Sequence, residues 1–168
     1  PNWAPEAQLG EAGSFARWGR LLLLRKPLPG PARALDAGRL LRGVQLGLFD
    51  RWLGARVADG LLGAVLPGDL VRTGSGGVET VAEVAPWRGR LDAFEAVALG
   101  PLFGAGMAPA QGEARAREQA VLAAAGLDDA LVGRLHGDRR AARAQPQQVQ
   151  LHPAGDDLEL AVELPIET

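Results

Sequence analysis

The stretch ALDAGRLLRGVQLGLFDRWLGARVAD, residues 34–59, decides the fold of this 168-residue chain. Its apolar residues recur at positions 41, 44, 48 and 52, and positions 49, 53 and 57 form an adjoining strip. Spacings of three and four residues place side chains on one side of an α-helix. The sequence therefore predicts a long helix with a broad apolar face, which serves as the spine of the core.

The residues before this helix predict a first helix and a connector. Ser14 precedes the run FARWGRLLLL, and its hydroxyl oxygen can cap the start of a helix. Three prolines and a glycine follow within residues 27–31, which prevents regular backbone hydrogen bonding. We expect the first helix to begin at Ser14 and to end before Pro27, and we expect residues 26–33 to form an irregular connector.

Strand-forming residues occur in two pairs of short runs. GDLVRT (68–73) and VETVAE (78–83) are separated by GSGG (74–77), whose glycines supply the positive φ angles of a hairpin turn. Further along, two strand-like runs flank a Pro-Ala-Gly-Asp turn. The sequence therefore predicts β-hairpins at 69–82 and 147–164.

The segment between the two hairpins is expected to be mainly helical. Pro86 suits a first helical turn, so we expect a helix from Pro86 to about Ala96, followed by an irregular glycine-rich segment over 99–109. Strong helix formers over 112–126 and a short run over 127–136 predict two more helices. Helices and hairpins are segregated along the chain, which favours an α+β fold with helices packed on short antiparallel β-hairpins.

The composition excludes several kinds of site. The chain has no cysteine, two histidines (His136 and His152) and one lysine, so a thiolate metal site, a disulfide and a thiol nucleophile are impossible. Each histidine fits a surface or turn position better than metal ligation. The glycine loops lack the Gly-Lys-Ser/Thr run of a nucleotide P-loop. We predict no metal and no cofactor.

The same composition indicates a location. Without cysteine the chain has no disulfide framework, so a reducing cytoplasm is the natural default, and no apolar run approaches the roughly 20 residues that span a bilayer. We therefore expect a cytoplasmic protein with no membrane segment.

Charge is unevenly distributed along the chain. The net charge is −2, but residues 1–60 carry nine basic and five acidic side chains, whereas residues 101–168 carry six basic and ten acidic ones. A net +4 at one end indicates a surface that can face phosphates, and the alternative is a set of solvated helix faces. The basic cluster consists of Arg17, Arg20, Arg25, Lys26, Arg33, Arg39 and Arg42.

The opening residues, PNWAPEAQLG (1–10), resemble the P-N-Y-F-G-x-Q-R-F-G motif of the tRNA pseudouridine synthase D (TruD) family. In that family, this motif leaves the catalytic domain and enters a large inserted domain particular to the family. RLLRGVQLGLFDRWLGARV (39–57) is similar to the family's L-S-A-x-R-S-x-L-F-N-x-x-L-A-x-R helix, with Phe49 in place and Asp50 where asparagine is usual.

Further segments resemble the family in the same order. VLPGDLVRT (65–73) is similar to its V-x-x-G-D strand, and VALGPLFGAGM (97–107) is similar to its T-A-P-L-P-G-x-G turn. Residues 112–127 resemble its acidic and alanine-rich helix. Residues 138–165 resemble its R-R-x-x-R-x-x-P-x-x-L-x-W segment, the polar turn after it and the strand that closes the domain. The resemblance implies a TRUD-type inserted domain over 13–160, with stubs of the catalytic domain at 1–12 and 161–168.

The resemblance also implies site residues. Asn2 stands at the family's active-site asparagine, and Trp3 replaces a tyrosine. Ala4 stands where a phenylalanine is expected to stack on the target uracil, and Ala7 and Gln8 replace glutamine and arginine. Stacking on an aromatic ring holds a base by about 1–3 kcal/mol, so either Trp3 substitutes for the missing ring or this chain binds its base poorly.

The family's catalytic aspartate lies in a G-x-K-D tetrad that this sequence lacks, because Lys26 is followed by Pro27. The resemblance therefore implies part of an isomerase that converts uridine 13 of tRNA to pseudouridine without a metal or cofactor, this segment alone being inactive. We expect a monomer whose partner is tRNA. The expected phosphate contacts, with Trp3 beside them, are Arg17, Arg20, Arg25 and Arg33, followed by Arg139 and Arg140.

Two alternatives remain open. The changes at Ala4 and Gln8, together with the acidic net charge, are compatible with a degenerate, noncatalytic RNA-binding or protein-interaction domain. Alternatively, Trp18, Trp52 and Trp87 mark a partner surface of an unrelated α+β interaction module, although their spacing favours burial in the core.

Overall fold

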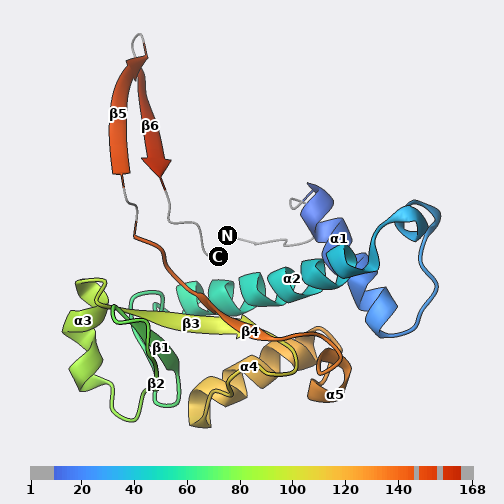
Figure 1. Cartoon of the computed structure of the whole chain (residues 1–168), viewed down its shortest axis with the longest axis horizontal. Coiled ribbons are helices and arrows are strands. Elements are labelled where there is room, and N and C mark those ends of the chain that lie inside the picture. Colours follow the sequence, from blue (N-terminus) through green and yellow to red (C-terminus); the bar gives the residue numbers. More distant parts are fainter. Residues whose placement is uncertain (1–9, 146–147, 155–156, 164–168) are drawn as a thin grey trace.

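The structure is a computed structural model that describes residues 10–145, 148–154 and 157–163. It is an α+β fold, as the sequence predicts. A four-stranded antiparallel sheet has the order β2-β1-β3-β4, and a separate pair of strands, β5 and β6, forms a hairpin that projects from the body in Figure 1. The helices pack along the sheet and around the long helix α2.

Helix α2 spans Ala37–Ala58 and confirms the predicted spine of the core. It begins where the Asp36 side chain accepts a hydrogen bond from the Arg39 amide, which satisfies one of the free donors of the first turn. Leu40, Val44, Leu48, Phe49 and Trp52 are buried along its length. The predicted adjoining strip at 49, 53 and 57 is wrong at its last position, because the Val57 side chain is 54% exposed.

Helix α1 spans Gly10–Leu23. The prediction that Ser14 caps its start is wrong, because the helix begins one turn earlier and Ser14 lies inside it. The predicted end before Pro27 is confirmed. The connector contains a short 3-10 turn, Gly30–Ala34, and therefore is not wholly irregular. Pro31 suits the first turn of such a helix because its missing amide donor would have no partner there.

The first predicted hairpin is confirmed as β1 (Leu70–Thr73) and β2 (Val78–Thr80), with Gly76 in the turn at φ 83°. The helix predicted from Pro86 to Ala96 is much shorter. A 3-10 turn, Ala85–Trp87, leads into α3, Arg88–Asp92. Phe94 then takes a left-handed φ of 56°, which ends the helix.

The segment predicted to be irregular over 99–109 contains most of a central strand instead. Strand β3 spans Ala96–Leu102, and β4, Asp138–Ala141, pairs with it although no strand was expected there. Glycine is required at Gly100, because an added Cβ would lie 2.4 Å from the Trp52 ring. Pro101 lies beyond Leu99, the last β3 residue paired with β1, so β3 is paired with β4 alone at that point and tolerates proline.

The remaining elements follow the predictions. Helix α4 spans Gly112–Ala124, and Gly126 follows its end at φ 64°. Helix α5, Asp129–Val132, is capped by the Asp128 side chain. Strands β5 (Gln148–Ala154) and β6 (Asp157–Glu163) confirm the second hairpin.

The core has apolar clusters at the two ends of α2, joined by Phe49, Trp52 and Leu102. Trp52 and Trp87 are buried, so for these two residues the prediction of core burial is confirmed against that of a partner surface; Trp18 is half-buried. Two charged pairs are also buried. Arg56 binds the Asp69 carboxylate at 2.9 Å, and Arg139 binds Glu118.

Candidate nucleic-acid interface

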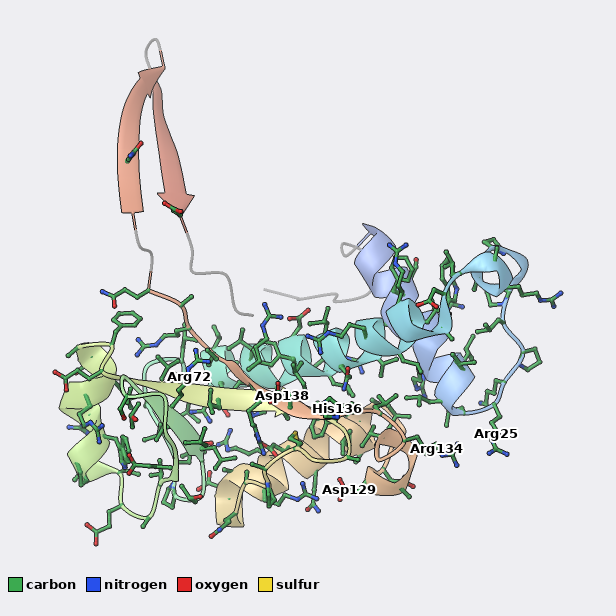
Figure 2. The ribbon with its side chains drawn as sticks, in the orientation of Figure 1. Arg25, Arg72, Asp129, Arg134, His136 and Asp138 are labelled. Carbon is green, nitrogen blue, oxygen red and sulfur yellow. The ribbon has the colours of Figure 1, made fainter. Side chains whose placement is uncertain are left out.

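The structure brings four of the predicted phosphate contacts to one end of the molecule. Arg17 and Arg20 are exposed on α1, Arg25 follows the end of that helix, and Arg33 lies in the 3-10 turn. Figure 2 shows Arg25 extending into solvent there. This end of the chain therefore presents cations from three successive segments.

Two of these arginines also contact other parts of the fold. Arg33 Nε donates to the Leu28 carbonyl at 3.0 Å, which folds its side chain over the connector. Arg20 reaches the end of α4, because a Cβ added to Gly126 would lie 2.9 Å from its Nη2 atom. A cation next to the C-terminal end of a helix also interacts favourably with the helix dipole. Arg17 and Arg25 are the more accessible candidates for RNA.

Arg25 has an unusual backbone conformation, with φ 53°. The Lys26 amide donates to Leu21 O and the Arg25 amide to Leu22 O, which is the hydrogen-bond pattern of a Schellman motif. Glycine is the usual residue at this left-handed position because a Cβ is strained there.

We expect Arg25→Gly to raise the free energy of unfolding by about 0.5–1 kcal/mol, because it removes this strain. Urea unfolding would measure the change. Arg25→Ala is the matched control, since it removes the same charge but keeps a Cβ at the left-handed position. Equal stability of the two variants would contradict the assignment of strain to Arg25.

The adjacent arginines Arg139 and Arg140 have different environments. The Arg139 guanidinium binds Glu118 and donates to Ala108 O at 2.7 and 2.8 Å, and its side chain is 6% exposed. Arg140 is exposed, and its guanidinium lies 5.1 Å from the centroid of the Phe49 ring. Arg139 therefore ties β4 to α4 and the loop before it, whereas Arg140 remains accessible to a ligand.

A groove of about 500 Å³ lies between α1 and α2. Its lining combines apolar residues and glycines with charged groups on α2, among them Arg39, Arg42 and Asp50. The Arg39 guanidinium lies 5.5 Å from the centroid of the Phe15 ring, and Phe15 meets Trp18 edge to face. The charge cluster in the sequence includes Arg39 and Arg42, but nothing local indicates that Phe15 and Asp50 lie beside them.

Glycines permit the close approach of the two helices that form this groove. A Cβ on Gly43 would lie 2.8 Å from Phe15 Cβ, and one on Gly47 would lie 3.0 Å from Ala16 Cβ. A Cβ on Gly19 of α1 would lie even closer, 2.1 Å from the Leu40 carbonyl oxygen. Small residues spaced by four on one helix face let two backbones pack tightly.

Asp50 lies at the end of the groove away from the start of α2. Partial burial raises the pKa of its carboxyl, and the nearby positive charge of Arg140 lowers it by a smaller amount. The side chain still reaches solvent, so the effect on stability is small. Because the pKa of Asp50 is raised in the folded state, the ionised Asp50 at neutral pH lowers the free energy of unfolding slightly, and this contribution disappears below pH 3.8, the ordinary pKa of the group.

The remaining predicted site residues, Asn2 and Trp3, lie outside the described residues. His136 is exposed, and its backbone carbonyl accepts a hydrogen bond from Gln45 at 2.8 Å. Within the described ranges, three or more potential metal ligands do not gather anywhere. Of the helices in that part of the chain, none has the length and apolar character needed to cross a membrane.

The fold and this surface define an α+β lobe with an arginine-rich helix pair, an arrangement suited to binding a polyanion. The family model described as tRNA pseudouridine synthase D (TruD) matches residues 40–166. The chain therefore belongs to the TruD family, which confirms the resemblance in its sequence motifs.

Individual relatives agree with this assignment. The tRNA pseudouridine synthase D of Anaeromyxobacter sp. (strain Fw109-5) is 38% identical over 175 residues, covering 98% of this chain and 50% of the relative. That of Thermus thermophilus is 36% identical over 126 residues, covering 75% of this chain and 35% of the relative. The chain thus spans half or less of the length of these curated relatives.

A solved structure has the same fold. The putative tRNA pseudouridine synthase D from Methanosarcina mazei matches with a TM-score of 0.60 at 20% identity, covering 90% of this chain and 41% of that one. At this identity the likeness concerns the fold alone.

Proposed function

We propose that this chain is the RNA-clamping part of a tRNA pseudouridine synthase that converts uridine 13 of tRNA to pseudouridine. The observation that carries the proposal is membership of the TruD family together with the exposed arginines of α1 and the connector. The protein acts in the cytoplasm as a monomer, and its partner is tRNA. The boundaries of the lobe are residues 13–160, with 1–12 and 161–168 joining it to the catalytic part.

The chemistry divides between this chain and the rest of the protein. The isomerisation detaches uracil, rotates it and rejoins it through carbon, with a catalytic aspartate contributed from another part of the protein. Asn2 supplies the active-site asparagine, and Trp3 provides the aromatic face that Ala4 lacks. Arg17, Arg20, Arg25 and Arg33 hold the phosphates, with Arg140 as a further contact. Arg139 is assigned to the fold, because its buried pair with Glu118 occupies its guanidinium.

The clamp predicts a salt-dependent loss of tRNA affinity. In the full-length protein, Arg17→Ala and Arg25→Ala should each weaken tRNA binding, and each should reduce the slope of log K against log salt by about 1. Filter binding across a salt series would measure both quantities. Arg88→Ala on α3 is the matched control, since Arg88 is exposed but lies away from α1. Unchanged salt slopes in both of these arginine variants would contradict the proposal that this lobe clamps tRNA through its phosphates.

A second candidate function is a noncatalytic RNA-binding or protein-interaction domain, favoured by alanine and glutamine at positions 4 and 8. Pseudouridine formation in a tRNA transcript by the full-length protein separates the two. An enzyme yields pseudouridine at position 13 and loses this activity in Asn2→Ala, whereas a noncatalytic domain yields none.

A further inference from the structure

The groove between α1 and α2 carries three kinds of group in a fixed order. Arg42, Leu46 and Asp50 all line it and follow one another at intervals of four residues on α2. Residues at this spacing lie on one face of a helix, and eight residues extend about 12 Å along the axis. The groove therefore presents a cation, an apolar stretch and a carboxylate in a line.

The opposite wall, formed by α1, adds an aromatic ring, and Arg39 on α2 adds a planar cation. Phe15 lines the groove from α1, and the Arg39 guanidinium lies against its ring. Unpaired RNA bases stack on aromatic rings and on arginine guanidinium planes. A volume of about 500 Å³ is within the usual range for small-ligand sites.

We propose that this groove binds an unpaired guanosine nucleotide of the RNA, with phosphate at Arg42, the base beside Phe15 and Arg39, and the base edge at Asp50. This inference rests on the proposed function. The tRNA clamp names only phosphate contacts, whereas this inference names a particular base and the groove that holds it. The line of cation, apolar stretch and carboxylate matches the order of phosphate, sugar with base face, and base edge in a nucleotide.

Guanine is the base that best complements the carboxylate. An ionised carboxylate only accepts hydrogen bonds, and the guanine edge presents N1–H and the N2 amino group side by side. Uracil presents one N–H between two carbonyl oxygens, which the carboxylate repels. The Asp50 side chain reaches solvent at the end of the groove, so its carboxylate oxygens can accept from the two N–H donors of the guanine edge.

Charge argues for a nucleotide over another protein segment. Arg39 and Arg42 line the groove together with Asp36 and Asp50, and the exposed Arg17 follows Gly13 of the lining by one helical turn. Asp36 already accepts a hydrogen bond from the Arg39 amide at the start of α2. The three arginines outnumber the two carboxylates of the lining, which suits a base with its attached phosphate. An apolar segment, whether from elsewhere in the protein or from a second copy, would leave these cations without partners.

Affinity measurements on the full-length protein with a fluorescent tRNA transcript provide the first test. Arg42→Ala should weaken binding about fivefold to tenfold and reduce the salt slope by about 1. Asp50→Asn should weaken it about tenfold, because an amide cannot accept both N–H groups of guanine. Arg88→Ala and Asp92→Asn on α3 are the matched controls and should bind as the unaltered protein does.

Crosslinking provides a second, base-specific test. A transcript that contains 6-thioguanosine should crosslink on irradiation to peptides from residues 13–16 or 42–50, and the same transcript with 4-thiouridine should not. Asp50→Asn should lose the 6-thioguanosine crosslink. Crosslinks to these peptides from 4-thiouridine but not from 6-thioguanosine would overturn the choice of guanine.

The outcomes also separate this proposal from the tRNA clamp. If the unaltered protein fails to bind tRNA, the proposed function is contradicted. If it binds tRNA but the two groove variants bind equally well, only the groove site is overturned. If those variants lower the melting temperature by several degrees without changing affinity, the groove is covered by protein, and the proposal is again overturned.

Discussion

Asp69→Ala is expected to lower the free energy of unfolding by about 3–5 kcal/mol, because it leaves the buried Arg56 guanidinium without its counterion. The Arg56 and Asp69 side chains are 2% and 5% exposed. Asp69 accepts hydrogen bonds from Arg56 Nη1 through both oxygens and from the Leu66 amide at 2.8 Å. One carboxylate therefore joins α2 to the turn that leads into β1.

Two further variants test this explanation by urea unfolding. Within the described residues, Arg56 Nε is buried without a hydrogen-bond partner. An apolar replacement therefore removes the desolvation penalty of this donor as well as the positive charge. The double variant Arg56→Met/Asp69→Asn should therefore recover most of the loss, since asparagine can still accept from the Leu66 amide. Arg117→Ala, which breaks exposed ion pairs with Asp59 and Glu113, should cost less than about 1 kcal/mol. A double variant as unstable as Asp69→Ala would contradict the unpaired-charge explanation.

Sequence patterns predict the elements whose signals are local. The apolar spacing identifies α2, and the glycine turn at 74–77 identifies the hairpin of β1 and β2. Sequence patterns fail where contact with a residue distant in the chain decides the backbone conformation. Gly100 and Pro101 are typical of a loop, yet they lie in β3 because the Trp52 ring packs against Gly100 and β4 covers one side. Ser14 resembles a cap, but α1 begins at Gly10 and includes it, and the helix packs on α2 through Phe15, Ala16 and Gly19.

The candidate site divides in the same way. The charge imbalance of the sequence identifies the exposed arginines of α1 and the connector. A cluster of basic residues can be counted along the chain without knowing which residues contact one another. The charge imbalance does not distinguish Arg139 from Arg140. That distinction depends on Glu118, a buried carboxylate on α4 that only the fold brings against β4. The groove is missed for the same reason, since Phe15 and Asp50 are 35 positions apart.

Gly19→Ala is expected to lower the free energy of unfolding by about 1–3 kcal/mol, despite the higher helix propensity of alanine. An added Cβ would lie 2.1 Å from the Leu40 carbonyl oxygen and 2.6 Å from Val44 Cγ2. The first of these atoms belongs to the α2 backbone and cannot rotate away. The two helices must therefore separate, which also weakens the contacts of Phe15 and Ala16 with Gly43 and Gly47.

Gly54→Ala is the matched control for this prediction. Gly54 also lies in a helix, but a Cβ there would meet no atom within 4 Å beyond the neighbouring backbone of its own helix, so alanine should stabilise the protein by about 0.5–1 kcal/mol. Opposite signs for the two glycines in urea unfolding are expected, and stabilisation by both would show that α1 and α2 are less closely packed. Since the same helix contact holds the two walls of the groove, Gly19→Ala should weaken tRNA binding as Arg42→Ala does, whereas Gly54→Ala should leave it unchanged.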